Sequence, residues 1–213
     1  MTGEFPVIVL GAGGHAKVVI DALQMTGTKI LGAVDPDPTS HGSSVLGVSV
    51  LGGDDVVLGH APDTVTLVNG VGSIQPASHR NDLYQKFKDA GYAFAPLIHP
   101  SAVVGGEVEL AGGVQIMAGA VVQPGCRIDA NTIINSRASL DHDSAVGAHV
   151  HIAPGAVICG GVIVGIDSFI GACATVIQYL SVGAGALVAA GAVVTSNVPS
   201  GARVAGVPAK VMK

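Results

Sequence analysis

The chain has 213 residues, of which 12% are charged and 3% are aromatic, and its net charge is -5 at pH 7. This length allows one or two domains, and the weak negative charge provides no basic surface for nucleic acid. No apolar run approaches the ~20 residues of a membrane span, and the N-terminus lacks a charged leader and a cleavage site. We therefore expect a cytoplasmic protein, whose three cysteines show neither metal nor disulfide spacing.

The first elements of the chain read as a strand at residues 7–10, a helix at residues 17–25 and a strand at residues 30–34. A Gly-rich turn, residues 11–16, joins the first strand to the helix. We expect the helix to face inward with four residues: Val18, Val19, Ala22 and Leu23. This order of strand, turn, helix and strand predicts the first βαβ unit of a nucleotide-binding domain.

The Gly-rich turn and the end of the second strand are candidates for nucleotide binding. A diphosphate is favoured at a helix N-terminus, where glycines let the backbone approach it. The turn residues expected to contact it are Gly11, Gly13, Gly14 and His15. Asp35, which Pro36 follows, is placed to accept hydrogen bonds from a ribose or from a neighbouring group.

Three interpretations of this unit remain open. One is a complete NAD-binding domain, because Ala16 at the third glycine position of the fingerprint is tolerated. The second is a half-sized domain that holds one nucleotide diphosphate. We favour it because only about 95 residues precede the repeats described below, fewer than a six-stranded dinucleotide fold needs. The third is a Gly-rich turn that binds nothing.

The rest of this region completes the predicted first domain, residues 1–96. Residues 45–55 read as a Gly-rich connection, residues 64–68 as a strand, residues 81–90 as a helix and residues 92–95 as a last strand. Asn69, Gly70 and Gly72 follow the third of the predicted parallel strands. We expect them at the same carboxyl edge as the first turn, where ligands bind in open α/β folds.

The second half of the chain repeats with a period of six. Every sixth residue from Ile98 to Val194 is Ile, Leu or Val, without a slip, in a chain that is 49% hydrophobic. Four residues after each aliphatic residue stands a small or β-branched one, with Leu180 as the interruption and Cys126 as a member. Both positions point inward on a strand, and the residue after the aliphatic one is often suited to a corner. The period predicts a parallel β-helix of hexapeptide repeats over residues 97–195, followed by a tail, residues 196–213.

One corner of the predicted β-helix carries the best candidate for catalysis. Asp141, His142 and Asp143 follow the inward Leu140, so they stand on a corner or an outer side. Two carboxylates would raise the basicity of the imidazole and could fix its tautomer, and transfer to an amine needs a base of near-neutral pKa. Which carboxylate contacts the ring stays open, and a solvated histidine in an acidic corner is the alternative.

Other polar positions of the repeats give weaker signals. Gly160 and Gly161 provide a surface without side chains, where a pantetheine arm could lie and backbone amides could polarise a thioester. Ordinary tight corners are the alternative for both. His149 and His151 could share a strand face as a metal pair, but no third ligand is evident, so we predict no metal site.

The β-helix, with the Ala205–Lys210 segment (AGVPAK) after it, resembles the acyl-CoA-dependent hexapeptide acyltransferases. The turn at residues 11–15, followed by Asp35, narrows the resemblance to sialic-acid O-acetyltransferases and nucleotide-sugar N-acetyltransferases. The latter act on the 4-amino group of UDP-bacillosamine precursors or GDP-perosamine. The resemblance implies a left-handed coil, acetyl-CoA as co-substrate, and a homotrimer with active sites between neighbouring β-helices.

The resemblance also implies roles for single residues. It matches His142 to the general base and Asp143 to the acidic residue that orients it, and it matches Asn135 to a position near the acceptor sugar. A plain corner residue is the alternative for Asn135. The residues expected to contact acetyl-CoA are His151, Gly160, Gly161, Ala172 and Ala190.

The resulting hypothesis is an acetyl-CoA-dependent N-acetyltransferase that acts on a nucleotide-linked 4-amino-4,6-dideoxy sugar by direct attack, without an acyl-enzyme. Two alternatives remain. One is an O-acetyltransferase of sialic acid or another sugar, and the other is a non-catalytic nucleotide-binding scaffold. No residue that would distinguish uridine from guanosine is identifiable, because backbone amides read only the diphosphate.

Overall fold

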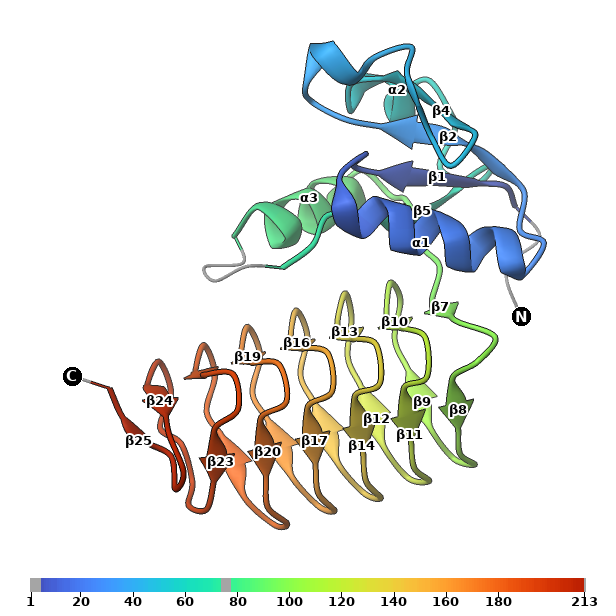
Figure 1. Cartoon of the computed structure of the whole chain (residues 1–213). Coiled ribbons are helices and arrows are strands. Elements are labelled where there is room, and N and C mark those ends of the chain that lie inside the picture. Colours follow the sequence, from blue (N-terminus) through green and yellow to red (C-terminus); the bar gives the residue numbers. More distant parts are fainter. Residues whose placement is uncertain (1–4, 74–77, 213) are drawn as a thin grey trace. The chain divides into compact units, whose positions relative to one another are not determined.

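The computed structural model describes residues 5–73 and 78–212, which belong to two units, residues 1–100 and residues 101–213 (Figure 1). Residues 1–4 of the predicted first domain and Lys213 of the predicted tail lie outside the described residues. Within the described part of the chain, no helix is long and apolar enough to cross a membrane.

The first unit is built on one six-stranded sheet with the order β3-β4-β2-β1-β5-β6. The strands are β1 (Val7–Leu10), β2 (Ile30–Val34), β3 (Ser44–Val45), β4 (Val48–Gly52), β5 (Thr66–Asn69) and β6 (Ala93–Phe94). All pair in parallel except β3, which is antiparallel to β4. Every residue of β1 is buried, as is typical of a central parallel strand that is covered on both faces.

The helices of this unit are α1 (Gly14–Met25), α2 (Asp55–Leu58) and α3 (Ser78–Asp89), with a short 3-10 helix, η1 (Pro38–Ser40). The buried residues of α1 are Ala16, Val19, Ile20, Ala22 and Leu23. The prediction that Val18 faces inward is therefore wrong, since its side chain is 40% exposed. Val18 is two positions from both Ala16 and Ile20, which places it on the opposite side of the helix.

The interpretation of residues 45–55 as a connection is also wrong, because this segment contains most of the β3–β4 hairpin. Leu46 and Gly47 form its two-residue turn with φ angles of 49° and 81°, the positive values that a type I′ turn requires. Val45 and Val50 are buried in the core of the unit. Elsewhere the predicted elements exist with shifted ends: β5 starts at Thr66 and α3 at Ser78.

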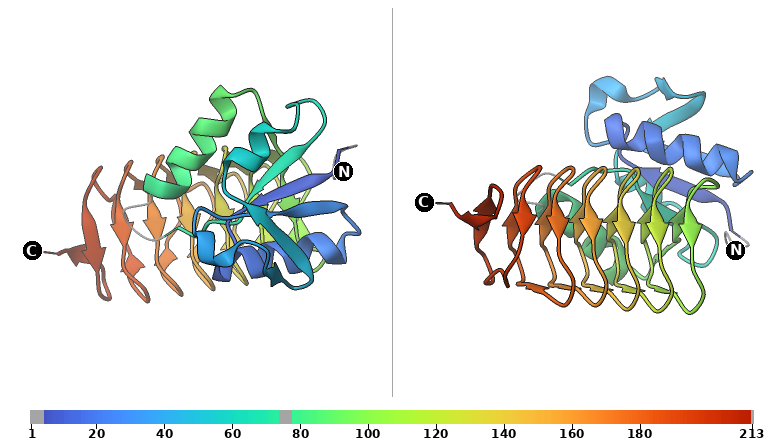
Figure 2. Two further views of the ribbon diagram at one scale, coloured as in Figure 1. Left: turned by 90° about the horizontal axis from the view of Figure 1, so that it is seen from above. Right: turned by 60° about the horizontal axis from the view of Figure 1, so that its bottom comes forward.

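The second unit is a left-handed parallel β-helix with short strands on three faces (Figure 2), each of two residues except β24, which has three. Face one begins at β7 (Leu97–Ile98), which precedes residue 101, and continues in the second unit with β10 (Gln115–Ile116), β13 (Ile133–Ile134), β16 (His151–Ile152), β19 (Phe169–Ile170), β22 (Leu187–Val188), β24 (Arg203–Ala205) and β25 (Lys210–Val211). Face two contains β8 (Val103–Val104), β11 (Val121–Val122), β14 (Ser139–Leu140), β17 (Val157–Ile158), β20 (Thr175–Val176) and β23 (Val193–Val194). Face three contains β9 (Glu109–Leu110), β12 (Arg127–Ile128), β15 (Ala145–Val146), β18 (Ile163–Val164) and β21 (Ser181–Val182). We call the turns that follow these faces corner one, corner two and corner three.

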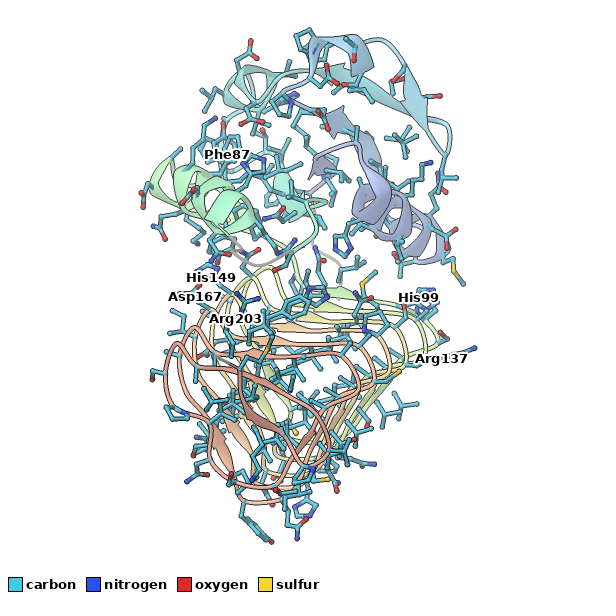
Figure 3. The ribbon with its side chains drawn as sticks, turned by 60° about the vertical axis from the view of Figure 1, so that its left-hand side comes forward. Phe87, His99, Arg137, His149, Asp167 and Arg203 are labelled. Atoms are coloured by element: carbon cyan, nitrogen blue, oxygen red, sulfur yellow. The ribbon has the colours of Figure 1, made fainter. Side chains whose placement is uncertain are left out.

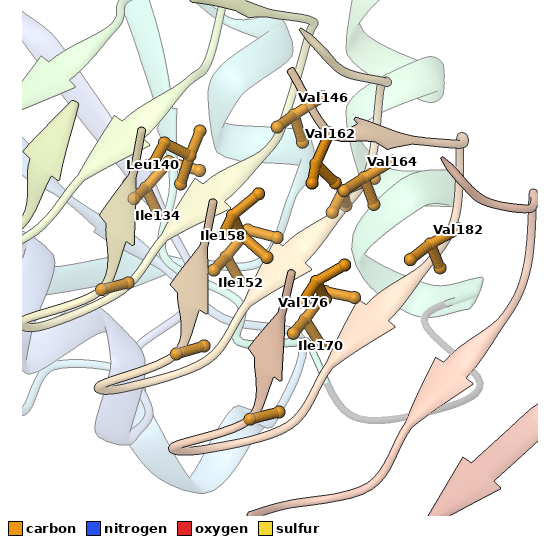
Figure 4. Close-up of a cluster of buried hydrophobic side chains, with 14 of the residues drawn as sticks. Ile134, Leu140, Val146, Ile152, Ile158, Val162, Val164, Ile170, Val176 and Val182 are labelled. Atoms are coloured by element: carbon orange, nitrogen blue, oxygen red, sulfur yellow. The ribbon is translucent and has the colours of Figure 1, made fainter. Parts of the chain in front are cut away.

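From β8 to β23 the second residue of each strand points into the coil and contributes to a continuous aliphatic core, part of which Figure 4 shows. Ile98 of β7, which the period also predicted to point inward, is instead 37% exposed, because β7 is the end strand of its face. From Ile116 to Val194 these aliphatic residues are buried, whereas Val104 and Leu110 near the open end of the coil are half-buried. Burying a Val, Leu or Ile side chain contributes about 1.5–3 kcal/mol, so the column is the main source of stability. Cys126 belongs to this core, as the period predicted.

Three inward positions carry hydroxyl groups, and each of them has an acceptor. The hydroxyls of Thr132 and Ser168 donate to main-chain carbonyls at 2.8 Å, and that of Ser144 does so at 3.1 Å. All three bonds reach the carbonyl of the residue after the aliphatic one in the next coil. The hydroxyls thus add a hydrogen bond between coils without leaving a polar group unpaired in the core.

The corners differ from the sequence-based interpretation in one respect. The left-handed backbone conformation falls on the third residue after the aliphatic one, as at Asp143 (φ 59°), and not on the first. The glycines at the first position are needed because the next coil approaches closely. A Cβ at Gly171 would lie 2.5 Å from the backbone N of Ala190, and one at Gly183 would lie 2.4 Å from that of Ser200.

Regular pairing continues beyond residue 195, where the β-helix was predicted to end. Val198 forms a bridge with Val182, and Val204 of β24 pairs with Val188 of β22. Both valines join the aliphatic core. Their partners stand 16 residues earlier, whereas the preceding coils pair at a spacing of 18, so the last coil is shorter and the six-residue period lapses there. The segment after Val204 reverses into β25, which is antiparallel to β24.

Candidate active site

The first unit holds a pocket of about 300 Å³ at the carboxyl edge of its sheet. Eight of the residues predicted for the nucleotide line it: Gly11, Gly13, Gly14, His15, Asp35, Pro36, Gly70 and Gly72. Four further lining residues were not predicted from the sequence: Asp54, Val71, His79 and Leu83. The predicted turns after β1 and β5 thus meet at one site, as the parallel sheet requires.

The N-terminus of α1 opens into this pocket without a side chain in the way. Gly13 is the N-cap and makes no side-chain cap, and the first turn carries no acidic residue. A Cβ at Gly13 or Gly14 would meet nothing within 4 Å, so the space beside these amides is open. Main-chain N–H groups and the positive end of the helix dipole are a favourable environment for phosphate.

Asp35 fixes the shape of the Gly-rich turn. Its Oδ2 accepts a hydrogen bond from the backbone N–H of Ala12 at 2.8 Å, and its Oδ1 accepts one from Asp37 at 3.0 Å. The sequence left open whether Asp35 accepts hydrogen bonds from a ribose or from a neighbouring group, and the Gly-rich turn is such a neighbouring group. Since each carboxylate oxygen accepts more than one hydrogen bond, Asp35 retains capacity for a ligand.

Asn69 was predicted as a nucleotide contact, but it is fully buried and does not line the pocket. Its Nδ2 donates to the carbonyl of Arg80 at 3.1 Å, and its Oδ1 accepts from the backbone N–H of Val71 at 3.1 Å. Arg80, which is 2% exposed, donates in return through Nη1 to the carbonyls of Asn69 and Val71. The two buried residues thus fix the turn after β5 by hydrogen bonds from the side away from the pocket.

Burial lowers the pKa of Arg80 to about 9, because desolvation disfavours the charged guanidinium. Sequence reasoning missed this residue, although a signal existed. Arg80 stands on the same helical face as Leu83, Tyr84 and Phe87, which are all buried. A charged residue on the apolar face of a helix usually has a fixed set of hydrogen-bond partners.

In the β-helix, corner two presents His142 between β14 and β15. The ring Nδ1 lies 2.8 Å from Oδ2 of Asp143, whereas Asp141 accepts a hydrogen bond from the backbone N–H of His142 at 2.9 Å. Asp143 is therefore the carboxylate that contacts the ring, which the sequence had left open. This pairing leaves Nε2 as the nitrogen that faces outward from the His142–Asp143 pair.

The acidic neighbours make this imidazole more basic. The hydrogen bond to Asp143 is the largest cause of the raised pKa of His142, followed by the negative charge of Asp141. Desolvation, which would lower it, is weaker because the side chain is half-exposed. A histidine with a fixed Nδ1 partner and a raised pKa is suited to accept a proton at Nε2.

Glycines on the neighbouring coils make room for the pair. A Cβ at Gly160 would lie 2.7 Å from Nε2 of His142, and a Cβ at Gly125 would lie 2.7 Å from Oδ1 of Asp143. The N–H of Gly161 donates to the carbonyl of His142 at 2.9 Å, so this amide is already used within the coil. Of the two amides that were expected to polarise a thioester, only that of Gly160 is therefore available.

Four other predicted residues lie at corner one or on face one. Asn135 and His151 contact each other, with Nδ2 of Asn135 at 3.0 Å from Nε2 of His151. Ala172 and Ala190 occupy corner one in later coils. Face two separates these residues from His142 within one chain. The β-helix therefore brings its candidate residues together in two groups, at corner two and around corner one.

His149 and His151, which were considered as a metal pair, lie at different places in the β-helix. His149 stands at corner three, where its Nδ1 lies 3.0 Å from Nδ2 of the buried Asn131. Asp167 follows at the same corner in the next coil, as Figure 3 shows. His149 and His151 thus bond to different asparagines. Within residues 5–73 and 78–212, no group of three or more His, Cys, Asp or Glu side chains could hold a metal ion.

Two cysteines lie near corner two in very different environments. Cys126 is buried in the coil, its Sγ donates to the carbonyl of Asp141 at 3.1 Å, and burial raises the pKa of its thiol. Cys159 is partly exposed and lines a shallow groove of about 210 Å³ on face two, together with Asp141. Cys159 is therefore the thiol to test for a covalent intermediate.

Comparisons with known proteins show which chains this one resembles. Residues 6–87 match the model of the PglD N-terminal domain. The structure of PerB from Caulobacter crescentus in complex with CoA and GDP-perosamine is 37% identical, with a TM-score of 0.91, and the match covers 100% of both chains. Variants of this perosamine N-acetyltransferase with one histidine replaced by asparagine or alanine match at 37% identity as well.

Two further structures match over almost the whole chain. The acetyltransferase domain of PglB from Neisseria gonorrhoeae FA1090, in complex with acetyl coenzyme A, is 35% identical with a TM-score of 0.91, over 99% of this chain and 100% of that one. WeeI from Acinetobacter baumannii AYE is 25% identical with a TM-score of 0.87, over 98% and 100% of the two chains. No curated protein matches the chain.

Proposed function

The chain belongs to the hexapeptide-repeat sugar acetyltransferases, and we propose that it acetylates the 4-amino group of a nucleotide-linked 4-amino-4,6-dideoxy sugar. It is an acetyl-CoA-dependent sugar N-acetyltransferase. The observation that carries the finer proposal is the pairing of His142 Nδ1 with Asp143, which leaves Nε2 to accept a proton beside a glycine surface. The match to an enzyme crystallised with GDP-perosamine supports this substrate class.

The first unit binds the nucleotide diphosphate in this proposal. The amides of Gly13 and Gly14 and the N-terminus of α1 contact the phosphates, and the Asp35 carboxylate holds the turn and accepts a ribose hydroxyl. Arg80 and Asn69 act from behind by fixing the turn after β5. Because backbone groups contact the phosphates, these contacts alone do not select between a GDP and a UDP sugar.

The reaction at corner two is a direct acyl transfer. The amine nitrogen attacks the thioester carbon, a C–N bond forms, and His142 Nε2 accepts the proton that the nitrogen loses. The C–S bond then breaks, and the thiolate of coenzyme A takes this proton from the imidazolium. Asp143 keeps the ring oriented and stabilises its positive charge, while the amide of Gly160 is the remaining main-chain donor for the oxyanion.

We further propose that the active site lies between neighbouring chains of a homotrimer. His142 and Gly160 stand at corner two, whereas Asn135, His151, Ala172 and Ala190 lie at corner one or on face one. A neighbouring β-helix that presents its corner one to corner two of this chain would unite both groups. Light scattering in solution tests this arrangement, and a monomer that is fully active would exclude it.

Direct attack also predicts that no cysteine becomes acylated. Replacing Cys159 with Ser should leave kcat and both KM values within about twofold of the wild type, because the groove thiol takes no part in the transfer. Steady-state kinetics measures this. A loss of kcat approaching that of a His142 variant, or an acetylated Cys159 detected by mass spectrometry after mixing with acetyl-CoA alone, would replace direct attack with an acyl-enzyme route.

The experiment that tests the proposed function is an assay of the purified protein with acetyl-CoA and GDP- or UDP-linked 4-amino sugars. Mass spectrometry should show one added acetyl group, and NMR should place it on N4. A product acetylated on a hydroxyl group, or turnover with free sialic acid in preference to all nucleotide sugars, would favour an O-acetyltransferase. Absence of any turnover with bound ligands would favour a scaffold.

A further inference from the structure

Corner two continues past the catalytic histidine to a tyrosine. Tyr179 occupies the left-handed position of its turn, with a φ of 58°, which Asp143 and Gly161 occupy in the two preceding coils. Its backbone N–H donates to the carbonyl of Gly160 at 3.0 Å. The main chain thereby ties Tyr179 to the coil on which the His142 ring lies.

The ring of Tyr179 lies directly against Gly161. A Cβ at Gly161 would stand 2.6 Å from Cδ1 and 2.8 Å from Cε1 of Tyr179, whereas a Cβ at Gly160 would stand 2.7 Å from Nε2 of His142. Two rings from the coils on either side therefore contact one glycine pair. With coils about 4.8 Å apart, Tyr179 begins roughly 10 Å along the corner from the His142 turn.

This ring is exposed, although it lies against the main chain of Gly161. Tyr179 is 76% exposed, whereas the other tyrosines, Tyr84 and Tyr92, are buried. An aromatic ring with few rotatable bonds offers a large contact area at a low entropic cost, and its hydroxyl group can hydrogen-bond to an amide. A tyrosine held over a glycine next to the reacting groups has the properties of a ligand contact.

The order of the residues along corner two indicates which ligand contacts the ring of Tyr179. The Nε2 edge of His142 lies over Gly160, so a thioester that reacts there also lies beside Gly160. Gly161 is the next residue at this corner, and the ring of Tyr179 lies against it. The pantetheine arm of acetyl-CoA is a long and narrow chain of methylene and amide groups. Extended along corner two from the thioester, it passes over Gly161 and reaches the ring.

We propose that Tyr179 is an acetyl-CoA-binding residue, whose ring and hydroxyl group contact the pantetheine arm beside Gly161. This inference rests on the proposed function, since it takes corner two as the site of acyl transfer. Gly161 then serves to seat the ring, in the same way that Gly160 accommodates the imidazole.

Steady-state kinetics of Tyr179→Ala tests the proposal first. The KM for acetyl-CoA should rise about tenfold, which corresponds to about 1.4 kcal/mol of lost binding, whereas the KM for the nucleotide sugar stays within twofold. Tyr179→Phe should recover most of the affinity if the ring dominates. Phe5→Ala, which removes an exposed aromatic residue from the other unit, is the matched control and should change neither KM.

Iodide quenching of tyrosine fluorescence tests the contact without turnover. The chain has 3 Tyr and 0 Trp, and only Tyr179 is exposed among the tyrosines, so the quenchable signal should come from it. Coenzyme A should protect this signal in the intact protein, and Tyr179→Phe should abolish the signal itself. Calorimetry with coenzyme A measures the affinity of each variant in parallel.

The outcomes separate the inference from the function on which it rests. If the wild type neither binds coenzyme A nor turns over, the proposed function fails. If the wild type binds and Tyr179→Ala binds equally well, the inference alone is wrong. A raised KM for the nucleotide sugar instead, or a Tyr179 that is already protected from iodide before coenzyme A is added, would overturn it too, by assigning the ring to the acceptor or to a protein contact.

Discussion

In the first unit the candidate ligand site consists mainly of backbone amides and glycines, whereas in the β-helix it consists of side chains that the repeat places at its corners. Asp35, the carboxylate at the pocket, already holds the backbone of Ala12. At corner two, His142 and Asp143 are half-exposed or exposed, and glycines of neighbouring coils leave room for them. In the proposed function, one unit therefore recognises the nucleotide, and the other presents the reactive groups to the two substrates.

The two kinds of site should respond differently to substitution. A site made of backbone groups is insensitive to most side-chain changes. A variant that does disturb it should alter the affinity for the substrate bound there and leave kcat largely unchanged. A side-chain site loses transition-state stabilisation when one group is removed, so a variant there should lower kcat.

The largest effect is expected for His142→Asn. The variant cannot accept a proton at Nε2, so kcat should fall by about 10²–10⁴-fold, while the thermal stability stays unchanged because the residue lies on an exposed corner. Both substrates should still bind. Steady-state kinetics with calorimetry measures this, and activity within tenfold of the wild type would remove His142 from the base role.

The next effect is expected for Gly160→Ala. Because the added Cβ would stand 2.7 Å from Nε2 of His142, the ring must move, and kcat should fall by about 10²-fold. Gly106 provides the matched control at the same corner two coils upstream of the His142 turn, where a Cβ meets nothing within 4 Å. Equal kinetics of the two alanine variants would show that the ring position over Gly160 does not matter.

A smaller and different effect is expected for Asp35→Ala. Loss of the carboxylate releases the backbone N–H of Ala12 and removes a candidate ribose contact. The KM for the nucleotide sugar should rise by about tenfold, whereas the KM for acetyl-CoA should stay within twofold. Parallel increases in both KM values would contradict the division of roles between the two units.

The smallest effect concerns the pH dependence of kcat in Asp143→Asn. The base must be neutral to accept a proton, so activity is lost as the pH falls through the raised pKa of His142. Asparagine removes the largest cause of that rise, so the acidic limb of the profile should move to lower pH. The maximal rate should also fall, because the ring is held less well. An unmoved limb would mean that another group titrates in the profile.

The sequence predicted most of the fold because repetition left little freedom. The six-residue period correctly placed the aliphatic core residue of each strand from Ile116 to Val194. It failed at Ile98, on the end strand of face one, and it lapsed where the last coil is two residues shorter, at Val198 and Val204. In the first unit, residues 45–55 were misread because the Leu46-Gly47 turn was not recognised between short alternating strands. The β3–β4 hairpin was thus identifiable only from the residues of its turn, and not from a hydrophobic period.

The candidate site was predictable by residue type but not by contact. The sequence identified His142 as a corner residue, yet only the geometry distinguishes Asp143 at the ring from Asp141 at the backbone. Asn135 and His151 were nominated for different ligands, but they hydrogen-bond to each other. Such contacts depend on the backbone conformation at each turn and on which residues stack 16 or 18 positions apart.

The most direct test of the central claim is a thermal-shift measurement of the intact protein with UDP, GDP, NAD and coenzyme A. A ligand that binds only the folded protein raises the melting temperature by mass action. We predict shifts with coenzyme A and with one of UDP or GDP, and in Asp35→Ala we predict that the nucleotide shift weakens while the coenzyme A shift remains. A shift with NAD alone, or with none of the four, would contradict the proposal that one unit holds a sugar nucleotide for acetyl transfer by the other.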